Sequence, residues 1–459
     1  MLRTDTICAL ATPAGMGAIA MIRISGNDAF KTIDSVFRPV KKGVTVQNSL
    51  SHTALFGTIE DNGELIDEVL VTVFKNPKSF TGEDSVEISC HGSVYIQQQI
   101  IQLLLKNGVR MADPGEFTMR AYMNGKMDLS QAEAVADIIE SESATAHKVA
   151  MNQMRGGFSK ELQQLRTQLI DFASLVELEL DFAEEDVEFA NRDQLADLMN
   201  TIQNHIQKLI QSFAMGNAIK NGIPVAIVGA PNAGKSTLLN ALLREERALV
   251  SEIAGTTRDT VEDEVHLGGV TFRFIDTAGL RDTEDVVESM GIERAYQKIE
   301  QARLVIFLFD AAVAKDPYSE YQNILAKAGD KPVLVISNKS DKSNAKDFSA
   351  EFNKVDNYLK LSAKNAEGIE ELENALIKAT GVHQINNNET IVTNARHLHA
   401  LTQAGENLAR AQQGLEMDLP GDLMAQDIRQ TLFHLGEITG EVSADDLLGN
   451  IFGKFCIGK

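Results

Sequence analysis

The chain has 459 residues, which at roughly 100–200 residues per domain predicts two to four domains. Hydrophobic residues make up 44% of the chain and charged residues 24%, so it can build buried cores and does not belong to the disordered class. The formal net charge of −22 argues against broad, non-specific binding of phosphate backbones. A nucleic-acid partner would therefore need a local basic patch or a second protein that helps to hold it.

The cysteines and the apolar runs indicate the compartment. Cys8, Cys90 and Cys456 are odd in number and widely spaced, which argues against disulfides and for a reducing environment. The first residues lack a basic segment followed by a long apolar run, so we expect no signal peptide. The longest apolar runs fall short of the roughly 20 residues that span a bilayer. We therefore expect a cytoplasmic protein with no membrane partner.

Residues 1–122 are expected to form an α+β domain. Alternating or apolar stretches predict strands in TICALATP, GAIAMIRI, HTALFGTI and LIDEVLVTVF. The stretch SVYIQQQIIQLLLKNG predicts a helix that ends at Gly108. Strands and helices mixed in this way are typical of the α+β class.

Residues 123–217 have a helical pattern and are expected to form the first half of an all-α domain. Ser130 and Glu133 match a capping box that opens a helix. Two later sets of apolar residues each fall on one helical face and predict long amphipathic helices. These sets are Leu162, Leu165, Leu169, Phe172 and Val176, then Leu195, Leu198, Ile202, Ile206, Leu209 and Phe213.

Residues 218–383 are expected to form an α/β domain, and helices return over residues 384–459. The strands PVAIVG, VTFRFID, RLVIFLFD and KPVLVIS are nearly all apolar, which indicates a parallel sheet buried on both faces. The polar stretches AMGNAIKNG and HQINNNE flank this domain. We therefore favour its insertion into one helical domain, because insertions are tolerated at loops with nearby ends. An independent C-terminal bundle is the alternative.

The sequence GAPNAGKS, from Gly229 to Ser236, matches the P-loop pattern G-x-x-x-x-G-K-[ST]. It follows the strand PVAIV and opens the helix STLLNALL, which is the context that the motif requires. Backbone N–H groups and a helix N-terminus would cradle phosphate oxygens. Lys235 would reach the β- and γ-phosphates, and Ser236 would bind Mg²⁺.

Three further motifs follow in order, each at the end of a predicted strand. DTAG ends FRFI, so Asp276 can hold Mg²⁺ through water and Gly279 can donate its N–H to the γ-phosphate. NKSD ends VLVIS, and its Asp341 carboxylate can accept two hydrogen bonds from the N1 and N2 edge of guanine, which adenine lacks. SAK, from Ser362 to Lys364, can offer a backbone N–H to guanine O6. Together the motifs predict a Ras-like P-loop G domain that binds GTP.

The G motifs lack one familiar catalytic group. Leu280 follows Gly279, so no amide at that position can orient the attacking water. The segment SEIAGTTRD is the natural switch I, with Thr257 as a second Mg²⁺ ligand. Arg258 is either a finger in cis or an ordinary surface charge. Another group must therefore supply positive charge and place the water.

The last residues, IFGKFCIGK, are apolar and carry Cys456 close to Lys459. They do not match a prenylation box, because the final residue is Lys and no polybasic stretch precedes it. We expect Phe452, Phe455 and Ile457 to pack into the helical domain and to direct Cys456 and Lys459 toward the N-terminal domain. Cys456 is either a nucleophile or a small buried apolar residue.

Along its whole length the chain resembles the MnmE (TrmE) family of bacterial tRNA-modification GTPases. The resemblance rests on ATPAGMGAIAMIRISG, SFTGEDSVEISCHG, PGEFTMRAYMNGKMDLSQAEA, the G motifs with AGTTRD, and the tail FCIGK. It implies an α+β folate-binding and dimerisation domain, an all-α helical domain and an inserted G domain. It also implies the following residues at the GTP site: Asn232, Ala233, Gly234, Lys235, Ser236, Thr237, Ser251, Glu252, Ile253, Ala254, Gly255, Thr256, Thr257, Asp276, Thr277, Ala278, Gly279, Asn338, Lys339, Asp341, Ser362, Ala363 and Lys364.

The resemblance further implies a potassium ion beside the phosphates in place of an arginine. Its ligands would come from Asn232, Ser251, Ile253 and Thr256, and Ser251 stands where many members have Thr. Glu288 in switch II would orient the attacking water through a second water. Mg²⁺ would be bound by Ser236 and Thr257.

The N-terminal domain is implied to bind a 5-formyl- or 5,10-methylene-tetrahydrofolate through Arg23, Glu83, Lys126 and Lys459. The implied reaction adds an aminomethyl or carboxymethylaminomethyl group to C5 of the wobble uridine of certain tRNAs. The implied assembly is a homodimer that forms a heterotetramer with the FAD-dependent protein MnmG. A GTP-timed RNA- or ribosome-assembly factor is the alternative function, and such a factor needs neither the folate residues nor the tail.

Overall fold

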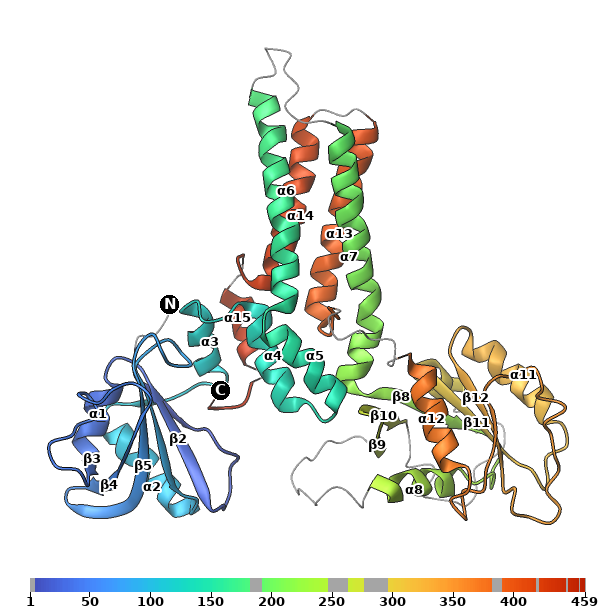
Figure 1. Ribbon diagram of the computed structural model, residues 1–459, viewed down its shortest axis with the longest axis horizontal. Helices are drawn as coiled ribbons and strands as arrows, with labels where there is room; N and C mark the ends of the chain where they lie inside the picture. The colour runs from blue at the N-terminus through green and yellow to red at the C-terminus, as the bar shows by residue number, and fades with distance from the viewer. Residues whose placement is uncertain are drawn as a thin grey trace. The chain divides into compact units, whose positions relative to one another are not determined.

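The computed structural model describes residues 5–181, 192–246, 263–275, 296–381, 390–417, 421–442, 445–453 and 455–458 (Figure 1). Compactness divides the chain into two units. One comprises residues 1–136, 153–191 and 410–459, and the other comprises residues 137–152 and 192–409. Within the described ranges, no helix combines the length and the apolar character that crossing a membrane requires.

The N-terminal domain is built on a seven-stranded sheet with the order β3-β4-β5-β6-β2-β1-β7. All neighbouring strands are antiparallel except β1 and β7. The strands are β1 (Ile7–Leu10), β2 (Ile19–Ser25), β3 (Phe37–Pro39), β4 (Thr53–Asp61), β5 (Glu64–Phe74), β6 (Ser85–His91) and β7 (Arg110–Met111). The four strands expected from the sequence are present as β1, β2, β4 and β5.

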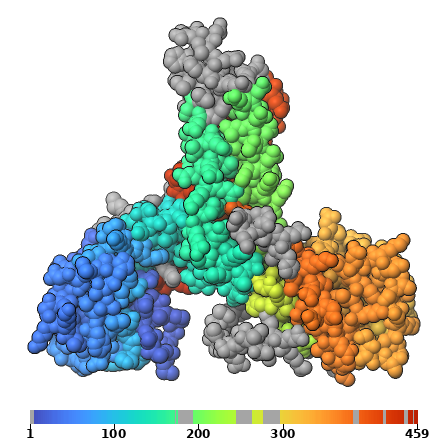
Figure 2. All heavy atoms as spheres, viewed as in Figure 1, coloured from blue at the N-terminus to red at the C-terminus, as the bar shows by residue number. Residues whose placement is uncertain are grey.

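Two helices, α1 (Ala29–Val36) and α2 (Val94–Lys106), complete this domain and share one apolar core with the sheet. Alternate residues of the strands supply that core, as Val69, Val71 and Val73 of β5 do. The helix predicted to end at Gly108 is α2, which stops at Lys106 with Asn107 as its C-cap. The space-filling view shows most of the domain, in blue, packed into one mass (Figure 2).

The next helices are α3 (Glu116–Met123), α4 (Leu129–Glu140) and α5 (Ala144–Met154). The capping box predicted from Ser130 and Glu133 is wrong by two residues. The Asp128 carboxylate accepts the Gln131 backbone N–H at 2.9 Å, and the Gln131 side chain accepts the Asp128 N–H at 2.9 Å. Asp128 therefore caps the helix, because a carboxylate is as good an N-cap as a hydroxyl and the helix starts one residue before Ser130.

Long amphipathic helices follow, as the sequence predicted: α6 (Gly157–Asp181), α7 (Arg192–Asn221), α13 (Ala395–Glu416) and α14 (Gly421–Thr439), with the short α15 (Asp445–Phe452) at the end. In the first unit α6 and α14 lie side by side (Figure 1). Leu162 and Leu169 of α6 are buried, as the amphipathic pattern predicts. In the second unit α13 and α7 approach closely at Gly405 of α13. A Cβ added to Gly405 would lie only 3.3 Å from Cγ2 of Ile206 on α7.

The G-type domain has a six-stranded sheet with the order β13-β12-β11-β8-β10-β9. All pairs are parallel except β10 with β9, which confirms the predicted parallel sheet and adds an antiparallel edge strand. Its elements are β8 (Ile223–Val228), α8 (Lys235–Glu246), β9 (Asp263–Leu267), β10 (Val270–Phe274), β11 (Leu304–Asp310), α11 (Pro317–Ala328), β12 (Val333–Asn338), β13 (Tyr358–Lys360) and α12 (Ile369–Thr380). Buried apolar clusters lie on both faces of the sheet.

The protein is therefore multidomain, with an α+β N-terminal domain, an all-α part and an α/β P-loop domain. In chain order α7 leads directly into β8, and α13 follows α12. The α/β domain thus stands between two helical stretches of the sequence. The domain boundaries 1–122, 123–217, 218–383 and 384–459 remain predictions.

Candidate functional site

The loop between β8 and α8 has a backbone that few residues can adopt. Gly229 has φ of +152°, and a Cβ there would lie 1.9 Å from the carbonyl oxygen of Leu308. Asn232 and Gly234 also have positive φ, at 60° and 104°. Glycine and asparagine tolerate these values, whereas branched residues do not. The glycines of the P-loop are therefore required by close backbone packing as well as by the turn.

Asn338, at the end of β12, joins two loops of this site. Its Nδ2 donates to the carbonyl oxygen of Ala233 at 2.8 Å, and its Oδ1 accepts the N–H of Ala363 at 3.1 Å. Only 1% of Asn338 is exposed, so loss of either bond would leave a buried polar group without a partner. A Cβ on Gly234 would lie 2.3 Å from Nδ2. The side chain predicted to touch the nucleotide thus also ties the P-loop to the SAK loop.

Asp310, at the end of β11, is a site residue that sequence reasoning missed. Lys339 donates from Nζ to Asp310 Oδ2 at 2.7 Å and to the Asn232 carbonyl oxygen at 2.6 Å, and Lys342 reaches the same carboxylate at 3.2 Å. Burial alone would raise the pKa of Asp310, but bonds from Lys339, the Ala312 N–H and Lys342 outweigh it and lower that pKa. The sequence offered one signal that could have identified Asp310, because it is the only charged residue of the strand LVIFLFD and stands at its carboxyl end.

Lys235 lies over the P-loop from the first turn of α8. Its Nζ donates to the carbonyl oxygens of Gly229 at 2.7 Å and Ala230 at 3.1 Å. Burial, with Lys298 nearby, lowers the pKa of Lys235. Ser236 and Thr237 follow it at the N-terminus of a 12-residue helix, where the first-turn N–H groups and the helix dipole favour an anion.

Asp341 and Ser362 lie together at the far end of the same sheet edge. The Ser362 hydroxyl donates to Asp341 Oδ1 at 2.6 Å, and this bond is the main cause of the lowered pKa of Asp341. Ser362 is fully buried and exchanges two backbone hydrogen bonds with Glu367, at 3.0 and 3.1 Å. Lys364 is exposed beside them. The carboxylate is therefore fixed as an acceptor for a ligand with adjacent N–H donors.

The remaining residues predicted for the GTP, Mg²⁺ and K⁺ sites lie outside the described residues. They are Ser251, Glu252, Ile253, Ala254, Gly255, Thr256, Thr257, Asp276, Thr277, Ala278, Gly279 and Glu288. Among the described residues, hydrogen bonds link the P-loop, the NKSD loop and the SAK loop to one another. That these residues bind GTP stays a prediction.

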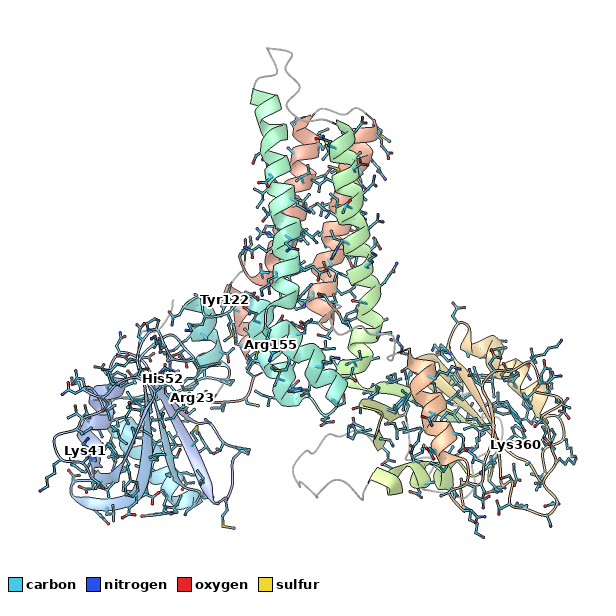
Figure 3. The ribbon with its side chains drawn as sticks, in the orientation of Figure 1. Arg23, Lys41, His52, Tyr122, Arg155 and Lys360 are labelled. Atoms are coloured by element: carbon cyan, nitrogen blue, oxygen red, sulfur yellow. The ribbon has the colours of Figure 1, made fainter. Side chains whose placement is uncertain are left out.

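A second candidate site is built around the loop between β5 and β6. Phe80 in this loop contacts the guanidinium of Arg23, whose Cζ lies 5.5 Å from the ring centroid. Lys126 donates from Nζ to the carbonyl oxygen of Pro77 at 2.8 Å. Glu83 lies at the end of the same loop. The loop thus gathers three residues that the family resemblance assigned to folate, and Figure 3 shows Arg23 on the N-terminal sheet.

The Arg23 guanidinium is held on several sides. Nε and Nη2 reach Glu87 Oε1 at 2.9 and 2.8 Å, and the Phe117 ring centroid lies 5.8 Å from Cζ. Nη1 donates to the Gly458 carbonyl oxygen at 3.4 Å. Arg23 therefore contacts the loop, the sheet and the C-terminal tail.

The C-terminal tail packs as predicted at Phe452 but not at Ile457. Phe452 is 2% exposed and lies in a cluster with Leu129 and Leu448, whereas Ile457 is 56% exposed. Beyond Phe455 the backbone of Gly458 packs against the backbone of Leu10 instead. The approach is so close that a Cβ on Gly458 would lie 2.4 Å from the Leu10 carbonyl oxygen. With the tail held by its backbone in this way, the Ile457 side chain remains exposed to solvent. Lys459 lies outside the described residues.

The three cysteines differ in accessibility. Cys8 and Cys90 are buried, and burial raises their pKa values to about 12 and about 11. Cys456 is exposed. Its exposure argues against the interpretation of Cys456 as a small buried apolar residue.

Comparisons with known proteins agree with this architecture. The family model described as the MnmE helical domain matches residues 129–456, and that of the GTP-binding protein TrmE N-terminus matches residues 6–126. Proteins named tRNA modification GTPase MnmE from Flavobacterium psychrophilum and Flavobacterium johnsoniae are 56% and 57% identical, with all of each chain covered. The one from Bacteroides thetaiotaomicron is 50% identical over the full length of both chains.

Among solved structures, the G domain of the T. maritima FeoB iron transporter is 23% identical, with 34% of this chain and 98% of that chain covered. Its TM-score of 0.26 is too low to carry any argument. The assignment depends on the two family models and the full-length relatives. On these matches, the chain belongs to the MnmE family of tRNA modification GTPases.

Proposed function

We propose that this protein is a K⁺-stimulated GTPase that adds an aminomethyl or carboxymethylaminomethyl group to C5 of the wobble uridine of certain tRNAs. It does so as a homodimer with a FAD-dependent partner, MnmG, and with a tetrahydrofolate derivative as one-carbon donor. The observation that carries the one-carbon part is the convergence of Arg23, Glu83, Lys126 and the tail around one loop. A GTP-timed assembly factor needs neither this loop nor the tail, so the convergence disfavours that alternative.

In the G domain, Lys235 and the N–H groups at the start of α8 bind the phosphates. The Ser236 hydroxyl is a hard oxygen ligand in the first turn of α8, next to Lys235, and this suits Mg²⁺ with Thr257 as the second ligand. A Mg²⁺ ion held there would supply positive charge against the β- and γ-phosphates. Asn232 would hold K⁺ together with Ser251, Ile253 and Thr256. Glu288 orients the attacking water in this proposal.

We expect Asp341→Asn to weaken GTP binding by about 3 kcal/mol, because two hydrogen bonds to a charged acceptor are lost. The same variant should gain affinity for xanthosine triphosphate, whose C2 carbonyl can accept from the new amide. Competition binding with labelled GTP measures both. Asp347→Asn is a matched control, since Asp347 is exposed, pairs with Lys360 at 2.7 Å, accepts the Ser349 N–H at 2.9 Å and stands outside the predicted GTP-binding set. Unchanged GTP affinity in Asp341→Asn would remove the guanine assignment.

In the N-terminal domain, the Glu83 carboxylate suits the N–H edge of a pterin, and cations at Arg23, Lys126 and Lys459 suit the carboxylates of the folate tail. Phe80, which is partly exposed beside Arg23, adds apolar surface for an aromatic ring. These residue types match the two ends of a folate, one rich in N–H donors and the other anionic.

Cys456 is proposed as the nucleophile that adds to C6 of the uracil ring, which makes C5 reactive, and that leaves again when the product forms. We expect Cys456→Ser to reduce tRNA modification to background while folate binding and GTP hydrolysis stay normal. Nucleoside mass spectrometry after reconstitution with the flavoprotein, tRNA, GTP and a folate donor provides the measurement. Normal modification by Cys456→Ser would show that the Cys456 thiol is not the nucleophile in this reaction.

The same reconstitution tests the whole proposal with the wild-type chain. Modified uridine should appear only when the chain, the flavoprotein, the folate and GTP are all present. If modification proceeds without folate, or if the chain binds no tetrahydrofolate, the one-carbon part of the proposal is wrong. If no modified uridine appears even in the complete reaction, the assembly-factor alternative stands instead.

A further inference from the structure

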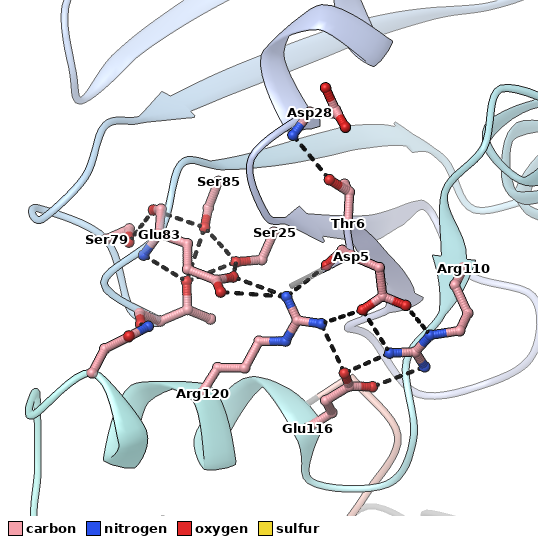
Figure 4. Close-up of polar contacts among 12 residues, drawn as sticks. Asp5, Thr6, Ser25, Asp28, Ser79, Glu83, Ser85, Arg110, Glu116 and Arg120 are labelled. Carbon is pink, nitrogen blue, oxygen red and sulfur yellow. Dashed lines mark hydrogen bonds and ion pairs between the residues drawn. The ribbon is translucent and has the colours of Figure 1, made fainter. Parts of the chain in front are cut away.

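Three hydroxyl side chains lie together beneath Glu83. Ser25, Thr81 and Ser85 are 0%, 0% and 5% exposed. Ser25 Oγ lies 2.7 Å from Thr81 Oγ1 and 2.8 Å from Glu83 Oε2, and Ser85 Oγ donates to Ser25 Oγ at 3.1 Å. Figure 4 shows Ser25 and Ser85 beside Glu83. The nearest of these hydroxyls to the carboxylate comes from β2, 58 residues away in sequence.

The direction of these hydrogen bonds follows from counting protons. An ionised carboxylate can only accept, so the single Ser25 proton must point at Glu83 Oε2. Ser25 Oγ must then accept from Thr81, whose own oxygen accepts the Glu83 backbone N–H at 3.2 Å. The bonds therefore form a ring that begins at the Glu83 N–H, passes through Thr81 and Ser25, and ends on the Glu83 carboxylate. Such a ring reinforces each of its bonds in a buried setting.

Arg120 contacts the carboxylate as well. Its Nη1 lies 3.3 Å from Glu83 Oε1 and 3.2 Å from Oε2. The Arg120 side chain is 2% exposed, whereas that of Glu83 is 22% exposed. Buried groups therefore hold the Glu83 carboxylate, while part of the Glu83 side chain remains exposed to solvent. This is the arrangement of a carboxylate that is oriented in advance for a ligand.

We infer that Ser25 is a positioning residue that holds the Glu83 carboxylate in place to accept the adjacent N–H donors of a 2-aminopyrimidinone edge, as in a pterin. The inference rests on the proposed folate site and deepens it. Ser25 itself is fully buried and acts through Glu83. An oriented acceptor avoids the cost of ordering the side chain when the ligand binds.

The test uses the full-length protein, isothermal titration and 5-formyltetrahydrofolate as the probe. Ser25→Ala removes the hydroxyl that meets the carboxylate and should weaken binding roughly tenfold, the effect of one hydrogen bond to a charged group. Ser85→Ala is the matched control, because it removes a hydroxyl of the same cluster that makes no contact with the carboxylate oxygens. It should change affinity less than threefold.

A double-mutant cycle separates positioning from a merely structural role. If Ser25 acts through Glu83, then Ser25→Ala should cause no further loss in a Glu83→Ala background. Equal losses in both backgrounds overturn the inference, as does wild-type affinity in Ser25→Ala. If Ser25→Ala does not fold, Ser25→Cys keeps the size with a weaker donor and should show a smaller loss in the same direction. Absence of binding by the wild-type chain instead overturns the proposed folate site itself.

Discussion

GTP hydrolysis by this protein should be roughly 10³-fold faster in KCl than in NaCl at matched ionic strength, since one charge stabiliser in phosphoryl transfer is worth about that much. The sequence has Leu280 where Ras-type GTPases place a water-orienting amide. Other GTPases gain positive charge at the phosphates from an arginine finger. The family resemblance implies that a monovalent cation beside the phosphates provides this charge here. Sodium is smaller, so the same ligands would hold it less well.

Asn232 is the proposed K⁺ ligand within the described residues, and its geometry makes a sharp test possible. Its backbone has φ of 60°, and its carbonyl oxygen accepts from Lys339 at 2.6 Å. The side chain is exposed on the loop, so the amide is available to a cation. Asn232→Gly keeps a residue suited to this left-handed backbone and removes only the amide. It should abolish most of the K⁺ preference while GTP binding remains.

Asn353→Gly serves as the control, because Asn353 is exposed in the same domain and outside the predicted GTP-binding set. Steady-state phosphate release in KCl, NaCl and RbCl gives the rates. Equal rates in KCl and NaCl for the wild-type chain would refute the potassium proposal. A full K⁺ preference in Asn232→Gly would remove Asn232 from the ligand set and leave the cation itself in place.

The G domain was predictable because its motifs are short and local. Each motif ends a buried strand, and the carboxyl ends of parallel strands meet at one edge of the sheet. The role of Asn338 as a link between Ala233 and Ala363 was not predictable, since it depends on residues 105 and 25 positions away. Asp310 was missed for the same reason: its partners Lys339 and Lys342 belong to the next strand's loop.

Local rules were less decisive where two residues satisfy them equally. The pairs Asp128–Gln131 and Ser130–Glu133 both match a capping pattern, and the two patterns are offset by two residues. Because α4 begins at Leu129 in the folded structure, the first pair forms the cap. The tail shows a second limit. Hydrophobicity predicted that Ile457 would be buried, but the backbone of Gly458 against Leu10 makes the contact and leaves Ile457 exposed.

The surroundings of Glu83 could not be predicted from the sequence at all. The residue itself was identified only through the family resemblance. Ser25 and Arg120 lie 58 and 37 positions from it, and neither pattern nor spacing relates them. A buried polar network of this kind is specified by the complete fold, because each member satisfies a hydrogen bond that another would otherwise lack.

Arg120→Met should lower the local free energy of unfolding of the N-terminal sheet by about 3–5 kcal/mol, the usual effect of removing one partner from a buried ion pair. Arg120 is 2% exposed and donates from Nη2 to Asp5 Oδ1 at 3.0 Å and to Glu116 Oε1 at 2.9 Å. The Glu116 side chain is 5% exposed. The apolar substitute would leave these carboxylates with Arg110 as their remaining basic partner in the network of Figure 4.

The predicted loss should depend on pH in a defined direction. Burial raises the pKa of Glu116, but bonds from Arg110, the Asp113 N–H and Arg120 outweigh it, so its folded pKa is lowered. A group with a lowered folded pKa stabilises the fold above its ordinary pKa, and that contribution is lost as the pH falls through the folded value. In Arg120→Met the carboxylates take up protons more readily. The gap between wild type and variant should therefore be largest near pH 7 and should narrow toward pH 4.

Hydrogen exchange followed by mass spectrometry on peptides of β1 and β2 measures this local free energy in the full-length chain, where global unfolding of several domains would obscure it. Lys106→Met is the matched control, because Lys106 is 66% exposed and its pair with Asp61 at 3.1 Å should contribute no more than about 1 kcal/mol. A loss in Arg120→Met no larger than in Lys106→Met would mean that the buried network adds little stability. A gap that stays constant from pH 7 to pH 4 would mean that the unpaired carboxylates are not its cause.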